Sequence, residues 1–416
     1  MSGDYSRFVF DPRQNYAGVL MQQGRVLLDQ DWNERSAIDS RTFRATIVDV
    51  LGRVFVATPC AFKIEEDGRG GLTIGRGRIY VDGLVAENHG AGSSVWDAAL
   101  DEQHGAEAVS YTQQPYLPSP PELPGPGGPY LVYLDVWQRE VTALEDPDLV
   151  DTAKGVDTTT RLQTVWQVKL CEASSVHPER PLDENRQFGP ATSRLSTALG
   201  SYTGVDNELY RVEVHDPGKI GAATFKWSRD NASTGGRVIR LIDLFHLVVQ
   251  TVGSGAGLGF STGDLIEITD DARELAGLPG ELRRIKAIGV PSNAVTLDAS
   301  LSPGVFLTDQ NGVPDVTRHM RVLRWQHSQP IGSPGNWIDL ENGISVSFNG
   351  DSDFRTGDYW LIPARSASQS FEPLDQAPPR GIHRHFARLA LFTPPHGLRD
   401  LRVQRTGRTK RTLPPC

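Results

Sequence analysis

The sequence predicts a mainly β protein with an N-terminal extended arm and helix, a β-sandwich-like main body and a small inserted β-barrel-like domain. Two observations support this fold class. After Pro59, short β-branched and aromatic runs recur with turn residues between them, which is typical of sheets. Gly and Pro together make 70 of the 416 residues, more than average, whereas residues 37–51 contain neither. The helix is therefore expected before Pro59 and the sheets after it.

The arm and helix form an expected assembly element at residues 1–56. Tyr5–Asp11 alternates bulky apolar and polar residues, which suits an extended arm. Four apolar residues then fall at helical i, i+4, i+7 and i+8 spacing, namely Phe43, Ile47, Val50 and Leu51. A helix is expected from Val26 to Leu51, ending before Gly52. Two interpretations stay open for it: an ordinary surface helix, or a helix that binds neighbouring subunits.

The β-rich main body is expected at residues 57–236 and 319–395. Its strongest strand patterns are Leu72–Ile74, Arg78–Val81 and Leu131–Trp137. Gln114–Pro129 holds seven prolines and three glycines, so it is expected to be an extended surface loop. A partner site of the P-x-x-P type is the alternative for this loop.

The small β-barrel-like insertion is expected at residues 237–318. Its strand patterns are Arg237–Ile242, Leu265–Ile268, Leu282–Ile285 and Ala294–Leu297. Four or five short strands within about 70 residues are typical of a small barrel or curled sheet. Similar Trp-bearing strands, Thr224–Trp227 and Val322–Trp325, flank this region and are assigned to the main body.

One short pattern, F-x-T-G-D-x-x-x-I, occurs twice. It covers Phe260–Ile268 and Phe354–Ile362. Its physical content is a Gly-Asp turn leading into a strand, in which Gly allows the turn conformation and Asp can accept from turn amides. Two copies are interpreted as the same local solution used twice and not as a repeat architecture.

The charge distribution separates a basic tail, residues 396–416, from an acidic body. The net charge is −9, but Arg399–Arg411 carries six basic residues against the single Asp400, which leaves 36 basic and 50 acidic residues elsewhere. An acidic body disfavours general nucleic-acid binding. The tail is compatible with a solvated end, a neighbouring copy, an acidic subunit or local contact with nucleic acid.

Cysteine content and hydropathy bear on the compartment. The three cysteines, Cys60, Cys171 and Cys416, are too few for a disulfide framework or a four-cysteine zinc site, so reduced thiols are expected. The sequence shows neither a signal-peptide pattern nor a run of about 18 apolar residues that could span a bilayer. We therefore expect a chain that is made in the cytoplasm without a signal peptide and has no membrane span.

Metal and enzyme motifs are weak. The sequence has no G-x-S-x-G elbow, P-loop, H-E-x-x-H or C-x-x-C. His383 and His385 would share one face of a strand, and His396 or His327 could supply a third ligand, but a surface or interface pair is the preferred interpretation. No catalytic, cofactor-binding or metal-binding residues are assigned, no cofactor is expected, and the chain is not expected to be an enzyme.

The acidic residues near Trp137 suggest a second chemistry. They are Asp135, Glu140, Glu145, Asp146 and Asp148. Paired carboxylates beside aromatic residues are what glycosidases use, and the eight tryptophans could stack on sugars. A solvated acidic loop and buried core tryptophans are the preferred interpretations.

Several longer strings are distinctive: Tyr5–Phe8, Tyr16–Val26, Leu28–Glu34, Asn207–His215, Thr224–Asn231, Thr356–Arg365 and Gly381–Ala390. They resemble one family of proteins of uncharacterised function, encoded in gene clusters for phage tails and phage-tail-like contractile injection systems. Gly77–Gly83 also resembles a β segment of tail proteins in which an N-terminal helix anchors a β-rich body. The resemblance spans nearly the full chain and brings no catalytic residues with it.

The resemblance implies a structural component of the particle, in the baseplate or fibre-attachment region, that acts through protein–protein assembly. The expected partners are other tail or baseplate subunits and further copies of the chain, in a particle that can be released from the cell. The alternative is a glycan-binding or glycan-cleaving module that recognises a target surface. Deleting residues 1–52 is expected to abolish incorporation and to leave a folded β body.

Overall fold

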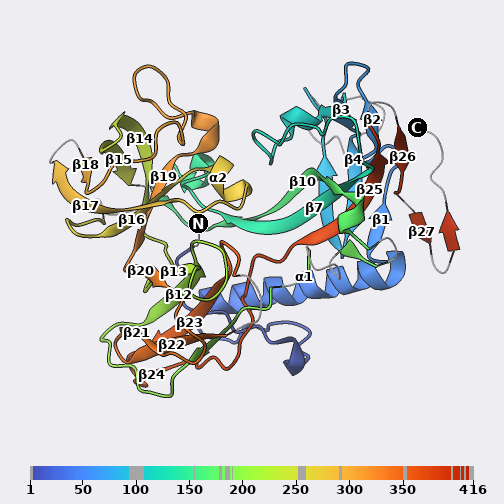
Figure 1. Cartoon of the computed structure of the whole chain (residues 1–416). Helices are drawn as coiled ribbons and strands as arrows, with labels where there is room; N and C mark the ends of the chain where they lie inside the picture. The colour runs from blue at the N-terminus through green and yellow to red at the C-terminus, as the bar shows by residue number, and fades with distance from the viewer. Residues whose placement is uncertain are drawn as a thin grey trace. The chain divides into compact units, whose positions relative to one another are not determined.

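The computed structural model shows two compact units, each assembled from three segments of the chain (Figure 1). Unit 1 comprises residues 1–8, 140–163 and 191–382, and unit 2 comprises residues 9–139, 164–190 and 383–416. The main body expected from the sequence is therefore divided between two units. The structure describes residues 3–92, 107–153, 155–177, 180–182, 188–189, 191–251, 259–289, 293–349, 354–394, 397–402, 404–406 and 409–411.

Unit 2 contains the predicted helix, α1 (Asp29–Leu51). It begins three residues later than expected because Leu28 has an extended backbone and its N–H donates to the Asp31 carboxylate at 3.1 Å. It ends before Gly52, whose positive φ of 89° breaks the helical path. Only Ile38 of this 23-residue helix is buried.

The sheets of unit 2 share one core. The largest has the order β10 (Arg161–Glu172), β7 (Tyr130–Val141), β25 (His385–Phe392) and β26 (Leu398–Asp400). Two three-stranded sheets pack with it: β1 (Val54–Val56), β4 (Gly77–Val81) and β5 (Leu84–Asn88), and β2 (Ile64–Glu66), β3 (Leu72–Ile74) and β6 (Val109–Ser110). Phe62 and Trp166 meet edge to face in this core, with ring centroids 5.0 Å apart.

Unit 1 contains a β-sandwich. One sheet has the order β20 (His327–Pro330), β13 (Thr224–Ser228), β12 (Glu208–Val214), β23 (Tyr359–Arg365) and β24 (Ser370–Phe371). The other has the order β11 (Arg194–Thr197), β22 (Ile344–Asn349) and β21 (Ile338–Glu341). Phe225, Phe348 and Trp360 lie in the core that the two sheets share. The predicted sandwich-like architecture is therefore confirmed.

Unit 1 also contains the predicted barrel, which is closed and six-stranded. Its order is β14 (Gly235–Asp243), β15 (His246–Thr251), β18 (Ala294–Leu297), β17 (Glu281–Gly289), β16 (Leu265–Thr269) and β19 (Arg321–Trp325), and the short helix α2 (Asp271–Leu275) follows β16. Strand β19 closes the barrel by pairing Arg321 with Arg237 and Trp325 with Leu265. The barrel therefore extends past residue 318, and the second Trp-bearing strand belongs to it.

The remaining described elements are short. They are the 3₁₀ turns η1 (Pro12–Gln14), η2 (Tyr111–Gln113), η3 (Pro147–Leu149), η4 (Ala173–Ser175) and η6 (Val316–Arg318), and the hairpins of β8 (Val150–Asp151) with β9 (Val156–Asp157) and β27 (Gln404–Thr406) with β28 (Thr409–Arg411). The Pro-rich stretch at 114–129 has no helix or strand, as predicted.

Two further findings concern the cysteines and the possibility of a membrane-spanning helix. Cys60 is disulfide-bonded, whereas Cys171 is free. This corrects the expectation that all the thiols are reduced. Among the described residues, no helix is long and apolar enough to cross a membrane.

Candidate functional site

The five acidic residues that suggested a glycosidase do not form one cluster. Asp135 lies in unit 2, where it accepts from Lys169 at 2.9 Å and Arg384 at 2.6 Å, and the other four lie in unit 1. Asp146 accepts from the backbone N–H of Asp148 and thereby caps η3. Asp135 and Glu145 are each 3% exposed, so the expected solvated acidic loop is wrong for these two residues.

The His383–His385 pair does not form a metal site. In unit 2, His385 Nδ1 lies 2.9 Å from Asp82, and Arg44 Nη2 lies 3.2 Å from His385 Nε2. A neutral ring with its proton on Nδ1 donates to Asp82 and accepts from Arg44, so both ring nitrogens are used. His327 lies in unit 1, and His396 lies outside the described residues. Among the described residues, no group of three or more His, Cys, Asp or Glu side chains is arranged so that it could hold a metal ion.

The carboxylate of Asp82 is held in its charged form. Burial alone would raise the pKa of Asp82, but hydrogen bonds from His385 and Arg53 outweigh burial and lower it to about 2. Arg44, on α1, also donates to the Asp82 carbonyl oxygen, at 3.3 Å. His385 therefore belongs to a polar contact between α1, β25 and the turn between β4 and β5.

Most tryptophans are core residues. Trp137, Trp166, Trp227, Trp325 and Trp360 are buried. Only two of the described tryptophans are exposed, Trp32 at 63% and Trp337 at 49%. The predicted core interpretation is confirmed for the five buried residues, and a sugar-stacking surface would have to use the other two.

The basic tail is partly incorporated into unit 2. The Arg402 side chain is buried, and its Nη1 donates to the carbonyl oxygens of Pro59 at 3.0 Å and Ala61 at 2.6 Å. Its Nη2 donates to Asp400 at 2.7 Å. The side chains beyond Arg402 lie outside the described residues.

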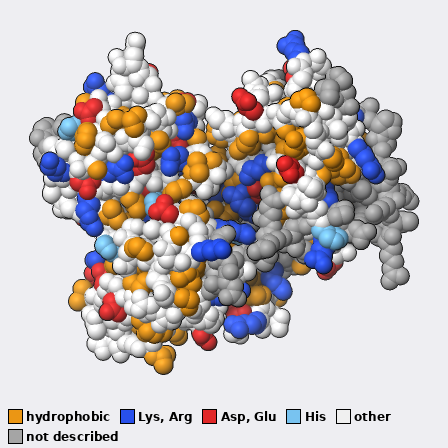
Figure 2. Space-filling view, viewed as in Figure 1, with side chains coloured by type: hydrophobic (Ala, Val, Ile, Leu, Met, Phe, Trp, Pro, Cys, Tyr) orange, Lys and Arg blue, Asp and Glu red, His pale blue; other side chains and the backbone are white. Residues whose placement is uncertain are grey.

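On the face seen in Figure 2, acidic and basic side chains are interspersed over the barrel.

A buried charge network joins the sandwich to the barrel inside unit 1. Lys226 of β13 lies 2.5 Å from Glu267 of β16 and 3.1 Å from Glu213 of β12. Glu213 also pairs with Arg211 at 2.6 Å. Trp325 Nε1 donates to Glu267 at 3.0 Å, and the Lys226 ammonium lies 4.5 Å from the centre of the Trp325 ring. Two positive and two negative groups thus balance each other away from water.

Electrostatics maintains the charges in this network. Burial alone would raise the pKa of Glu267, but Lys226 outweighs burial and lowers it to about 2. Burial would lower the pKa of Lys226, and the two carboxylates raise it instead. Burial and the nearby Lys226 together lower the pKa of His215, so this ring tends to be neutral. The arrangement favours a fixed ion cluster over proton transfer.

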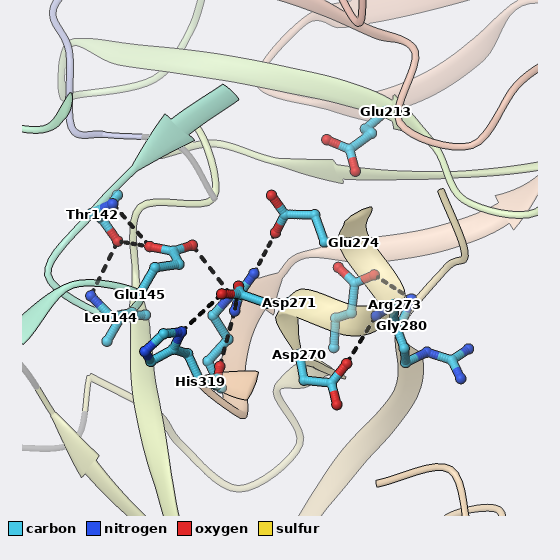
Figure 3. A network of polar contacts seen from close by, with 12 residues as sticks. Thr142, Leu144, Glu145, Glu213, Asp270, Asp271, Arg273, Glu274, Gly280 and His319 are labelled. Atoms are coloured by element: carbon cyan, nitrogen blue, oxygen red, sulfur yellow. Dashed lines mark hydrogen bonds and ion pairs between the residues drawn. The ribbon is translucent and has the colours of Figure 1, made fainter. Parts of the chain in front are cut away.

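A second network surrounds Arg321, a fully buried residue of β19. Figure 3 shows Glu145, Asp271 and Glu274 converging on one point. Arg321 contacts Glu145 at 3.3 Å and Asp271 at 2.8 Å, and it also pairs with Glu274. Asp271 accepts from His319 at 2.8 Å, and Glu145 accepts from the Thr142 hydroxyl at 2.6 Å.

The Arg321 network ties the segment after β7 to the barrel. Burial alone would lower the pKa of Arg321, but the carboxylates of Glu145, Glu274 and Asp271 raise it, so the guanidinium stays charged. Glu145, a candidate for glycan chemistry, is 3% exposed and is used in this contact. Sequence reasoning missed both networks, although charged residues inside apolar strands, such as Lys226 between Phe225 and Trp227, were a usable signal.

The two Gly-Asp turns lead into strands as predicted, β16 after Asp264 and β23 after Asp358. Gly263 and Gly357 both have positive φ, at 95° and 85°. The carboxylates differ: Asp264 accepts from the Ser261 amide at 2.8 Å, whereas Asp358 is 4% exposed and accepts from the Ser193 hydroxyl at 3.4 Å. Burial raises the pKa of Asp358 to about 7.

The largest concentration of exposed apolar side chains lies on the N-terminal segment, residues 16–50. Nine of the 21 exposed large hydrophobic residues in the described chain belong to it: Tyr16, Leu20, Met21, Val26, Leu27, Leu28, Trp32, Phe43 and Val50. Leu20 is 91% exposed and Val26 83%. Exposed apolar residues gathered in this way mark interaction sites more often than scattered ones do.

These features define a class: a β-rich protein of two units whose described charged networks are structural and whose N-terminal segment is apolar and exposed. The chain belongs to DUF6519, a family of unknown function, which matches residues 1–184 and 192–378. No curated protein and no solved structure gives a significant match to the chain.

Proposed function

We propose that the chain is a structural component of a phage tail or contractile injection system particle, in the baseplate or fibre-attachment region. It is made in the cytoplasm, assembles with other tail subunits and with further copies of itself, and performs no catalysis. The resemblance of its longer strings to proteins of such gene clusters motivates the class. The observation that carries the assembly role is the exposed apolar N-terminal segment, residues 16–50.

Helix α1 buries very little apolar surface within the chain. Most of the stability of a protein helix comes from packing an apolar face, yet α1 buries only Ile38. Phe43 and Val50 on the same helix are 55% and 66% exposed. Burying one such side chain against a partner contributes about 1.5–3 kcal/mol. A neighbouring subunit that covers this segment would therefore stabilise both the helix and the assembly.

The test compares two double variants of the full chain in the organism that encodes it. Leu20→Asp with Met21→Asp places two charges on the N-terminal segment. Leu199→Asp with Val205→Asp is the matched control, because both residues are exposed and lie in unit 1. Sheathed particles are sedimented and the chain in them is quantified by mass spectrometry.

We expect the wild type and the control in the particle fraction and the Leu20/Met21 variant in the supernatant, all with the same circular dichroism spectrum. Absence of the wild-type chain from every particle fraction would refute the tail assignment. Equal incorporation of the two variants would refute the role of the N-terminal segment.

Glycan binding is the alternative, and the exposed Trp337 is the observation that favours it. An indole face open to solvent can stack on a sugar ring. Under this alternative, the purified chain binds members of a glycan array and Trp337→Ala abolishes that binding, whereas Trp32→Ala leaves it unchanged. Failure of the wild-type chain to bind any glycan removes the alternative.

A further inference from the structure

The N-terminal arm, residues 3–8, is bound to a built surface on unit 1. Gly3 is buried: its N–H donates to Glu140 at 3.1 Å, and its carbonyl oxygen accepts from Asn231 Nδ2 at 2.8 Å. The Tyr5 hydroxyl lies 2.6 Å from the Thr160 hydroxyl and 3.3 Å from Glu140. Burial raises the pKa of Tyr5, and the Glu140 carboxylate raises it further, so the phenol stays protonated.

The rest of the arm is held along its length. Arg365 donates to the Ser6 carbonyl oxygen at 2.7 Å, and Arg7 pairs with Glu372 at 3.5 Å. The Arg380 guanidinium lies 4.8 Å from the centre of the Phe8 ring. A Cβ atom added at Gly3 would come within 2.7 Å of the Tyr5 ring and 2.9 Å of Thr160. This surface therefore accepts a glycine followed two residues later by a tyrosine.

The connection that follows the arm, residues 9–28, has few ties to the chain. Residues 12–18 and 20–28 are exposed, and η1 is the only regular element described among them. The hydrogen bonds described for residues 12–28 join residues no more than four apart in the sequence. Twenty residues can span up to about 70 Å. The connection therefore does not determine which copy of the chain supplies the arm.

We propose that the arm-binding surface of unit 1 is occupied, in assemblies of this protein, by the arm of a second copy, with residues 9–28 as the crossing segment. The inference rests on the proposed assembly function and names its partner as the chain itself. Every contact between the arm and this surface is the same whichever copy contributes the arm, so exchange forms an oligomer without any loss of these contacts. Leu20, Met21 and Val26 on the crossing segment favour exchange, since two crossing segments can bury them against each other.

The test co-expresses two copies of the full chain with different affinity tags. One copy carries photoreactive benzoylphenylalanine in place of Phe8, and the purified protein is irradiated and analysed on a denaturing gel. We expect a covalent product that carries both tags and whose linked peptide contains Glu372 or Arg380. The matched control places the same residue at Phe245, an exposed aromatic position of the barrel in unit 1, and is expected to give no two-tag product.

Two variants separate arm exchange from other association. Gly3→Val blocks the arm, and Asn231→Gly removes the donor to Gly3 while tolerating the positive φ of 55° at this position. Each is expected to reduce the two-tag product at least tenfold and to shift the mass measured by light scattering to that of a monomer. Crosslinks confined to single copies, or a two-tag product unchanged in both variants, would overturn the proposal. Because purified protein is used, this outcome is independent of incorporation into particles.

Discussion

Lys226→Met removes the positive charge at the centre of the network that joins the sandwich to the barrel. Glu213 keeps its partner, because Arg211 lies 2.6 Å away, but Glu267 loses the ammonium at 2.5 Å. Glu267 then retains two neutral donors, Trp325 at 3.0 Å and the Gly280 amide at 3.0 Å, and faces the His215 ring, whose Nδ1 lies 3.7 Å away and whose pKa burial lowers. The variant therefore buries an uncompensated carboxylate that is 4% exposed.

The magnitude follows from the charge interaction. The lowering of the pKa of Glu267 from 4.5 to about 2 corresponds to about 3 kcal/mol in favour of the ionised form. Removing one member of a buried ion pair generally costs about 3–5 kcal/mol. We expect Lys226→Met to lower the free energy of unfolding of unit 1 by a similar amount at pH 7.

The pH dependence gives this prediction its sign. In the wild type, the depressed pKa of Glu267 stabilises the fold above pH 4.5, and this stabilisation is lost as the pH falls toward 2. In Lys226→Met, burial without the ammonium raises the pKa of Glu267, so protonation stabilises the folded variant. The difference between the two proteins should therefore be smaller at pH 4.5 than at pH 7.

The assay is urea unfolding at both pH values, with amide hydrogen exchange of the β13 and β16 peptides to report on unit 1. Lys226→Met with Glu267→Gln is the control: it removes the unpaired charge, and we expect it to recover at least half of the lost stability. A loss below about 1 kcal/mol in the single variant, or an equal loss in the double variant at both pH values, would refute the reasoning.

Three further predictions concern single charged residues, each measured by urea unfolding. Arg321→Met leaves three carboxylates without the positive charge that they share and should lower the free energy of unfolding by about 3–5 kcal/mol at pH 7. Arg321→Lys keeps a positive charge and should lower it by less. At pH 8, the free energy of unfolding of Asp358→Asn should exceed that of the wild type by up to about 4 kcal/mol. The reason is that a pKa of about 7 for Asp358 makes the stability of the wild type fall as the pH rises from 4 to 7. Parallel stability–pH profiles of the two proteins would contradict this. Asp82→Asn should lower the free energy of unfolding by about 2 kcal/mol at pH 7. The loss should become smaller as the pH falls toward 2, because the pKa of Asp82 in the wild type is about 2. A difference in stability that stays constant with pH would count against this prediction.

The local elements could be predicted because their signals are local. Gly and Pro are absent from residues 37–51, and α1 ends at Leu51 as expected. The strand pattern Ala294–Val295–Thr296–Leu297 coincides with β18. The start of α1 was placed too early because Val26 and Leu27 continue the apolar pattern, whereas the boundary is set by the Asp31 carboxylate, which accepts from the N–H of Leu28 three residues earlier.

The division into units could not be predicted, because it depends on pairings between distant segments. Strand β25 pairs with β7, with Ala387 opposite Leu134, and no feature of either strand specifies the other. The role of Glu145 could not be predicted for the same reason, because its ion-pair partner Arg321 lies on β19, far away in the sequence. The charges inside apolar strands were visible, but their partners were not.

The segmented architecture has a consequence for synthesis. Strand β25, which lies between β7 and β26, leaves the ribosome more than 240 residues after β7. At about 5–20 residues per second, one edge of β7 waits about 10–50 s for its partner. An unpaired edge strand is a template for association with other chains. Nascent copies made on one message are therefore exposed to each other before unit 2 can close, and a chaperone that shields β7 would protect the yield of the folded protein.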